Sequence, residues 1–198
     1  MKKYAVTLWL TFLFAIIAVL FWRNEFVYSL PTPVPQNYKP VHNGTSIALP
    51  ASLAAHKNLP VFLHFFNPDC PCSRFNIQHF KSLTEEYGNQ VNFAVVLMTK
   101  KNYTALDIQK RFGLSIPVIT DSTLAKTCGV YSTPQAVILD PQQQLYYRGN
   151  YNRSRYCTDK KTNYAQQALE ALLTRTNTLP ADQWAYTAYG CQLPTCTK

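Results

Sequence analysis

The sequence predicts an α/β domain in which helices flank a central mixed sheet, preceded by one transmembrane helix. Three observations support this prediction. Continuous apolar runs typical of buried strands alternate with segments of helical periodicity. A cysteine pair, Cys70 and Cys72, follows the first of these runs at the point where a helix is expected to begin. An apolar stretch without charge, from Tyr4 to Trp22, precedes the whole pattern.

The stretch from Tyr4 to Trp22 is long enough for one membrane span. At about 1.5 Å per residue its helix measures roughly 28 Å, close to the hydrocarbon thickness of a bilayer. Lys2 and Lys3 precede it, so the positive-inside rule leaves residues 1–3 in the cytoplasm and exports the remainder. A cleaved signal peptide is the alternative, but signal peptides have shorter apolar regions that end in small residues. We therefore expect an uncleaved signal anchor.

The exported part divides into a linker, a domain and a tail. Residues 23–44 contain several prolines, so we expect an extended and fairly stiff linker. The domain is expected at 45–176. Residues 177–198 form a tail without periodicity that carries Cys191 and Cys196. The formal net charge is +9, which past an export signal favours an acidic or lipid partner over nucleic acid.

The order of elements in the domain follows from hydrophobic spacing. Val61–Phe66 is a continuous apolar run, which indicates a strand buried on both faces. Ser73–Tyr87 has apolar residues at helical spacing, and Gly88 is a natural end for that helix. The later elements are expected as strand Val91–Met98, helix Tyr103–Phe112, strand Pro117–Thr120, helix Ser122–Cys128, an antiparallel hairpin of Gln135–Asp140 with Leu145–Gly149, and a last helix around Ala165–Leu172.

The cysteine pair has the chemistry of a redox site. The thiolate is the reactive form of cysteine, and the free N–H groups at a helix N-terminus lower the pKa of a thiol placed there. Cys70 lies at such a helix start, with Pro71 tolerated in the first turn. About sixty residues later Thr133 and Pro134 open another buried strand.

These segments resemble the redox site of thioredoxins. The run from Val61 to Cys70 is similar to the strand and turn before the nucleophilic cysteine, and Thr133-Pro134 is similar to the threonine–cis-proline loop beside it. More narrowly, roughly residues 45–175 resemble membrane-anchored thioredoxin-like thiol-disulfide oxidoreductases of Gram-negative envelopes. The resemblance implies a thioredoxin-like fold, a single-pass inner-membrane anchor with the domain in the periplasm, and no cofactor or metal.

The resemblance also implies roles and partners. Cys70 and Cys72 would be catalytic, Thr133 and Pro134 would bind the substrate backbone, and the substrates would be protein thiols or disulfides of the envelope. A membrane or periplasmic partner would donate or accept electrons. Thioredoxins have two residues between their cysteines, however, and this chain has one.

Two interpretations of the short spacing follow. In the first, which we favour, Cys70 and Cys72 form a tight disulfide, which would suit an oxidase or isomerase. In the second, Cys70 is resolved by a distant cysteine of the tail, Cys191 or Cys196. A local loop closed between these two tail cysteines is the alternative use for them.

Other reactive residues have simpler interpretations. His64 stands where thioredoxins commonly bury an acidic residue, so it is either a base or, as we favour, a hydrogen-bonded core residue. Cys128 and Cys157 are either buried thiols or a structural disulfide. The basic residues interleaved with tyrosines between Tyr146 and Lys161 are expected to be a solvated connection rather than a docking surface.

Two other functions remain open beside exchange catalysis. Cys70 and Cys72 with His79 would make a soft ligand set suited to Cu(I), as in a copper chaperone of thioredoxin fold. A non-catalytic thioredoxin-like adaptor, which binds a partner through its tail and basic segment, is the third possibility.

Overall fold

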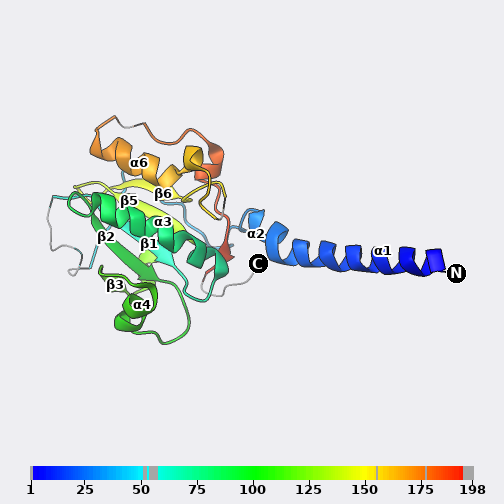
Figure 1. The fold of residues 1–198 in the computed structure, drawn as a ribbon. Helices are drawn as coiled ribbons and strands as arrows, with labels where there is room; N and C mark the ends of the chain where they lie inside the picture. Colours follow the sequence, from blue (N-terminus) through cyan, green and yellow to red (C-terminus); the bar gives the residue numbers. More distant parts are fainter. Residues whose placement is uncertain (1, 51–52, 54–57, 155, 177, 194–198) are drawn as a thin grey trace.

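A long apolar helix stands apart from the α/β domain in the computed structural model, which describes residues 2–50, 53, 58–154, 156–176 and 178–193. Helix α1 (Lys2–Phe21) projects outward in Figure 1, and a π-helical turn, η1 (Trp22–Phe26), with α2 (Val27–Ser29) joins it to the domain. None of the residues of α1 is buried. Its length and composition are sufficient to cross a membrane, and no other helix in the described ranges meets that standard.

A five-stranded mixed sheet forms the centre of the domain, in the order β3-β2-β1-β5-β6. Strand β1 (Val61–Phe66) runs parallel to β2 (Asn92–Leu97), which runs parallel to β3 (Val118–Ile119). On its other side β1 pairs antiparallel with β5 (Gln135–Leu139), which forms the expected hairpin with β6 (Leu145–Gly149). The mixed sheet predicted from the sequence is confirmed.

Four helices accompany the sheet close to their expected positions: α3 (Pro71–Tyr87), α4 (Ala105–Phe112), α5 (Thr123–Thr127) and α6 (Tyr164–Leu173). Helix α4 begins with a capping box in which Thr104 and Asp107 exchange side-chain hydrogen bonds with each other's backbone N–H. It ends at Gly113, whose φ of 61° is the left-handed conformation that glycine adopts without cost. Short elements complete the fold: β4 (Ser132–Thr133), η3 (Lys160–Thr162), η4 (Gln183–Ala185) and β7 (Cys191–Gln192).

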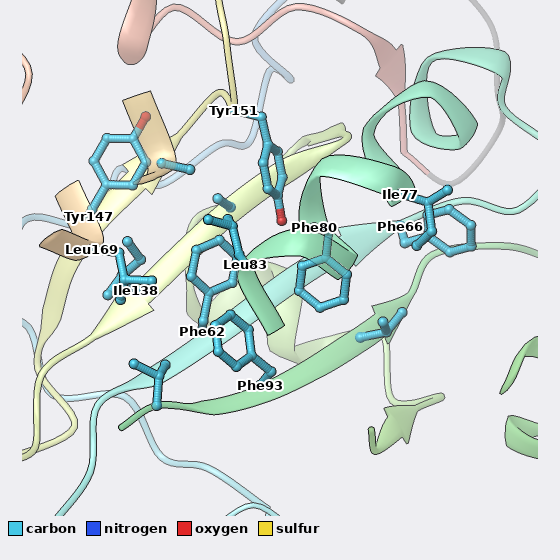
Figure 2. Packing of buried hydrophobic residues seen from close by; sticks show 14 of the residues in the cluster. Phe62, Phe66, Ile77, Phe80, Leu83, Phe93, Ile138, Tyr147, Tyr151 and Leu169 are labelled. Carbon is cyan, nitrogen blue, oxygen red and sulfur yellow. The ribbon is translucent and has the colours of Figure 1, made fainter. Parts of the chain in front are cut away.

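One face of the sheet carries an aromatic core. Side chains alternate along a strand, so Phe62 and Phe66 of β1 point to this face. Figure 2 shows Phe62, Phe80 and Phe93 gathered between α3 and the sheet, and the ring centroids of Phe62 and Phe93 lie 5.3 Å apart. Leu169 of α6 packs into the same cluster. The aromatic cluster therefore holds α3 against this face of the sheet, and this packing fixes the position of the helix N-terminus.

The opposite face of the sheet has an aliphatic core. Leu63 of β1 and Val137 of β5 contribute to it, and Leu124 of α5 covers it together with Ile47 from the segment before β1. Val41, from within the proline-rich segment, packs against its rim. The aliphatic core therefore fixes β1 and β5, the strands next to the cysteine pair and to the Thr133-Pro134 loop.

Segments outside the expected domain limits also pack onto the domain. Tyr38 donates a hydrogen bond from Oη to the carbonyl of Gly129, at 2.9 Å. In the tail, Ala185 and Ala188 are buried. Asn150 donates from Nδ2 to the carbonyls of Trp184 and Thr187 (2.6 and 2.7 Å), which holds the tail against the end of β6. Residues 184–188 of the tail therefore lie against the end of β6.

Candidate redox site

Cys70 is positioned by a hydrogen-bonded turn between β1 and α3. It is the N-cap residue of α3 in extended conformation (φ −86°, ψ 124°), and Pro71 follows at the first helical position. Its N–H donates to the carbonyl of Asn67 (3.1 Å), while the Asn67 side chain accepts from the N–H of Asp69 (3.0 Å). The N–H of Asn67 in turn donates to the hydroxyl of Ser73 (3.2 Å). The Cys70 sulfur is thereby fixed at a helix N-terminus, which favours a thiolate.

The Thr133-Pro134 loop has the conformation that the resemblance implies. The bond between these residues is cis, and Thr133 is fully buried. Directly before the proline, β4 pairs antiparallel with β7, so that Thr133 lies opposite Cys191 and Ser132 lies opposite Gln192. This two-stranded ladder was not predicted from the sequence, because each strand has two residues and no periodicity.

Three cysteines converge at this loop, and we call Cys70, Cys72 and Cys191 the sulfur site. Cys70 and Cys191 form a disulfide across 121 positions of the chain, and Cys72 supplies the third sulfur. All three Sγ atoms lie within 4.8 Å of one another, and each residue is at most 2 % exposed. Burial to this degree means that a partner reaches these sulfurs only if a covering segment moves.

The disulfide differs from the one favoured by the sequence analysis. The bond joins Cys70 to Cys191, as in the second interpretation, rather than to Cys72. The physical reason is the ladder between β4 and β7, which places Cys191 beside the start of α3. Cys191 is bonded to Cys70 rather than to the other tail cysteine considered for it, Cys196, which lies outside the described residues.

The ligand set considered for the copper alternative, Cys70 and Cys72 with His79, is not assembled among the described residues. Among the described residues, the histidine, cysteine and acidic side chains close enough to share one ion are Cys70, Cys72 and Cys191. His79 is not a member of that group, because it lies farther along α3 with its ring 6.0 Å from the ring of Tyr151. A soft metal ion at this site would therefore have three sulfur ligands.

His64 is a core residue, as favoured from the sequence. Its ring is fully buried, stacks on Phe80 with centroids 4.5 Å apart, and has Nδ1 2.7 Å from the Tyr151 hydroxyl. Desolvation by burial, with a smaller contribution from His79, lowers the pKa of His64 to about 3. The imidazole is therefore neutral at physiological pH.

Cys128 and Cys157 are separate thiols, so the structural disulfide considered for them is absent. Burial raises the pKa of the Cys128 thiol to about 12, although the Arg148 guanidinium acts in the opposite direction. Burial also raises the pKa of Cys157 to about 12, and its thiol donates to Oδ1 of Asn76 at 2.9 Å. Both residues are therefore protonated and unreactive under ordinary conditions.

The basic, tyrosine-rich segment makes contacts within the molecule. Tyr147 and Tyr151 are buried in the aromatic core. Arg148 donates from Nη1 to the carbonyls of Val41 and Cys128 (2.9 and 3.1 Å). The guanidinium of Arg153 lies 5.6 Å from the ring centroid of Trp184. These contacts hold the segment against the domain, so its basic residues serve packing and the cysteines are the candidate reactive groups.

Solved structures share the fold. A hypothetical protein from Sinorhizobium meliloti 1021 has a TM-score of 0.64 at 18% identity, with 79% of this chain and 96% of that chain covered. An uncharacterized conserved protein from Geobacillus kaustophilus gives 0.58 at 21% identity, with coverage of 78% and 93%. A thiol:disulfide interchange protein of the thioredoxin family from Chlorobium tepidum TLS gives 0.50 at 15% identity, with coverage of 68% and 99%. The fold is thioredoxin-like, as predicted.

Sequence comparison places the chain in a family. No curated protein matches it. Residues 39–194 match the family described as "Domain of unknown function (DUF6436)", and this range includes the whole sheet, the four domain helices and all three cysteines of the sulfur site. The chain belongs to the DUF6436 family, whose fold is here a thioredoxin-like domain with a disulfide between Cys70 and Cys191.

Proposed function

We propose that this protein is a membrane-anchored thiol-disulfide oxidoreductase of the cell envelope, which exchanges disulfides with protein substrates through Cys70. One observation carries the proposal. Cys70 lies at the N-terminus of α3, beside the Thr133-Pro134 loop, and shares a disulfide with Cys191 while the sulfur of Cys72 lies within 4.8 Å. Three sulfurs in mutual reach at a helix N-terminus support exchange more directly than a purely structural disulfide would.

Oxidation of a substrate would proceed by two displacements at sulfur. A substrate thiolate attacks Sγ of Cys70, the bond to Cys191 breaks, and Cys191 leaves as a thiolate. A second substrate thiolate then attacks the substrate sulfur of the mixed disulfide and releases Cys70 as a thiolate. The substrate loses two electrons and gains a disulfide, while Cys70 and Cys191 gain the two electrons. The helix N-terminus assists the last displacement because it stabilises the departing thiolate.

Cys72 adds an internal exchange to this scheme. Its thiolate can attack Sγ of Cys70, which forms a Cys70–Cys72 disulfide and releases Cys191 as a thiolate without net oxidation or reduction. The Cys70–Cys72 disulfide and the Cys70–Cys191 disulfide would then be two states of one site. Cys72 thus has the role of a second resolving cysteine.

The apolar helix α1 supports anchoring of this activity at the inner membrane, with the domain in the periplasm. Its apolar composition and lack of buried residues suit a lipid surrounding. A membrane or periplasmic partner would then return the sulfur site to its starting oxidation state.

A redox titration with cysteine mapping tests the proposal. Full-length protein in detergent is equilibrated in glutathione buffers, alkylated, and mapped by mass spectrometry, and oxidation of reduced ribonuclease is followed in parallel. We expect Cys70 and Cys191 to titrate together, and Cys70→Ser to reduce exchange to the uncatalysed rate. Cys128→Ser is the matched control and should retain full exchange. Exchange that persists in Cys70→Ser would refute the proposal.

The sulfur site also supports a second candidate, Cu(I) binding. Three buried sulfurs within 4.8 Å suit a soft ion once the disulfide has been reduced by two electrons. Reduced protein titrated with Cu(I) against a competing chelator should then bind one ion, and both Cys72→Ser and Cys191→Ser should weaken it. Failure of exchange together with failure of copper binding would leave the adaptor role.

A further inference from the structure

The tail segment Tyr189–Gln192 occupies the place where a substrate would meet the sulfur site. It pairs antiparallel with β4, and its cysteine, opposite Thr133, is joined to Cys70. The ladder continues past β7, because the N–H of Leu193 donates to the carbonyl of Tyr131 at 3.4 Å. The tail thus contributes main-chain pairing and a sulfur–sulfur bond together, the two contacts that a cysteine-containing partner would make here.

The geometry of this pairing demands glycine before the cysteine. Gly190 has φ of 127°, and a Cβ built on it would lie 2.3 Å from the carbonyl oxygen of Thr133. That oxygen belongs to the backbone of β4, so it cannot move aside as the end of a side chain can. Two positions after Cys191, Leu193 packs against the aliphatic core. The occupant of this edge therefore has the pattern glycine, cysteine, any residue, apolar residue.

The membrane-proximal linker holds the tail from its other side. Pro31 forms an antiparallel bridge with Tyr189, and the N–H of Thr32 donates to the carbonyl of Ala188 at 2.7 Å. Thr32 is 3 % exposed, and its hydroxyl lies 3.5 Å from the carbonyl oxygen of Gly190, to which it donates. The tail is consequently enclosed between the linker and β4.

Resting on the proposed function, in which the Thr133-Pro134 loop pairs with the substrate backbone, we propose that the tail is a resident occupant of the β4 edge with the form of a substrate. The partner that fits is an extended segment with glycine directly before its reactive cysteine and an apolar residue two positions after it. Such a segment must displace residues 189–192, because the sulfur site is buried beneath them. The contacts of the linker to the tail then set how readily a substrate enters.

A peptide capture reaction tests both parts of this inference. The probe is a peptide with blocked ends that copies residues 188–193, its cysteine linked to thionitrobenzoate. The Cys70 thiolate attacks the peptide sulfur, forms a mixed disulfide with the peptide and releases coloured thionitrobenzoate as a thiolate. The reagent is reduced full-length protein with Cys72, Cys191 and Cys196 all changed to serine, so that the tail keeps its backbone pairing and no neighbouring thiol competes for Cys70 or releases the bound peptide. Peptide mapping counts only the adduct at Cys70.

The first comparison concerns the peptide. A second peptide with alanine in place of glycine should be captured at least about tenfold more slowly, because its methyl group meets the Thr133 carbonyl. Equal capture rates for the two peptides would overturn the glycine requirement.

The second comparison concerns the gate. Thr32→Pro removes the N–H that binds Ala188, and should accelerate capture of the glycine peptide by about fivefold to tenfold. Val34→Pro, at an exposed position of the same linker, is the matched control and should leave the rate unchanged. Gly190→Ala should also accelerate capture, because it weakens docking of the tail itself.

These outcomes separate the inference from the function on which it rests. If Thr32→Pro and Gly190→Ala capture the peptide no faster than Val34→Pro, the tail does not control entry, although Cys70 and Cys191 still titrate with glutathione. If that pair fails to titrate at all, the exchange function itself fails.

Discussion

The sulfur site and the core both bury cysteine, but the two regions surround the sulfur atoms differently. In the sulfur site, Cys70 lies at a helix N-terminus with two other sulfurs within 4.8 Å. In the core, Cys128 is surrounded by aliphatic side chains, and the thiol of the partly buried Cys157 donates a hydrogen bond to Asn76. Burial is common to both regions, so burial alone does not decide reactivity. The groups that can stabilise a thiolate, or receive it in a new bond, make the difference.

Protonation follows the same division between the two regions. Desolvation keeps the core residues uncharged, since it raises the pKa of Cys128 and Cys157 to about 12 and lowers the pKa of His64 to about 3. In the proposed exchange reaction, the proton transfers are therefore expected at the sulfur site rather than at His64.

The largest expected effect is on the alkylation of core thiols. With a pKa of about 12, the thiolate fraction of Cys128 near neutral pH is about a thousandfold below that of an ordinary cysteine. Iodoacetamide should therefore modify Cys128 in folded protein about a thousandfold more slowly than in protein unfolded by urea. Mass spectrometry of quenched samples measures both rates.

The pH profile provides the control for this prediction. Alkylation of unfolded protein should level off above about pH 9, whereas alkylation of Cys128 in the fold should continue to rise as far as the fold survives. If the alkylation rate of Cys128 in folded protein levels off at the same pH as in unfolded protein, burial does not raise the pKa of this thiol and the prediction is wrong.

The part of the sulfur site that carries Cys70 was predictable from the sequence, because long elements with regular hydrophobic spacing form it. The apolar run of β1, the helix after Pro71 and the hairpin of β5 and β6 each have a pattern that spacing reveals. The Thr133-Pro134 loop was recognised because it opens β5. Local pattern thus determines where Cys70 lies.

The tail side of the site could not be predicted in the same way. Strands β4 and β7 have two residues each, and pairing over such a length depends on tertiary contacts rather than on periodicity. The disulfide spans 121 positions, and cysteine spacing does not encode connectivity. Gly190, directly before Cys191, was the one available signal, because glycine often marks a close approach of two backbones.

A smaller effect is expected in the pH dependence of stability. The folded pKa of His64 is about 3 against an ordinary 6.5, so on acidification the unfolded state binds the proton first. Its contribution to the free energy of unfolding is complete above pH 6.5 and is lost as the pH falls toward 3. At pH 5 the loss relative to neutral pH should be about 2 kcal/mol. Urea denaturation at the two pH values measures it.

Two variants isolate the histidine in this measurement. His64→Gln should lower the overall stability but remove about 2 kcal/mol from the pH-dependent difference. His42→Gln, at an exposed position, should keep the full difference. The same pH dependence of stability in His64→Gln and wild type would mean that His64 takes up protons in the folded state. Desolvation would then not keep this core residue uncharged.

The smallest expected effect concerns Asn76, which joins the two regions. Its Nδ2 donates to the carbonyl of Cys72 (3.0 Å), and its Oδ1 accepts from the thiol of Cys157 (2.9 Å). Asn76→Ala should cost about 1 to 2 kcal/mol in the free energy of unfolding, because it removes buried hydrogen bonds. Arg74→Ala, at an exposed position on the same helix, should stay within about 0.5 kcal/mol of wild type.

A double-mutant cycle with Cys157→Ala decides whether this contact matters to the comparison. If the thiol hydrogen bond is intact, the two substitutions together should cost about 1 kcal/mol less than the sum of the single costs. Glutathione titration of Cys70 and Cys191 in the same variants gives the functional readout. If the redox midpoint of Cys70 and Cys191 is unchanged in Cys157→Ala, the Cys157 thiol affects stability but not the sulfur site. A shifted midpoint would instead mean that Asn76 transmits the state of a core thiol to the first turn of α3, and the boundary between the two regions would pass through this side chain.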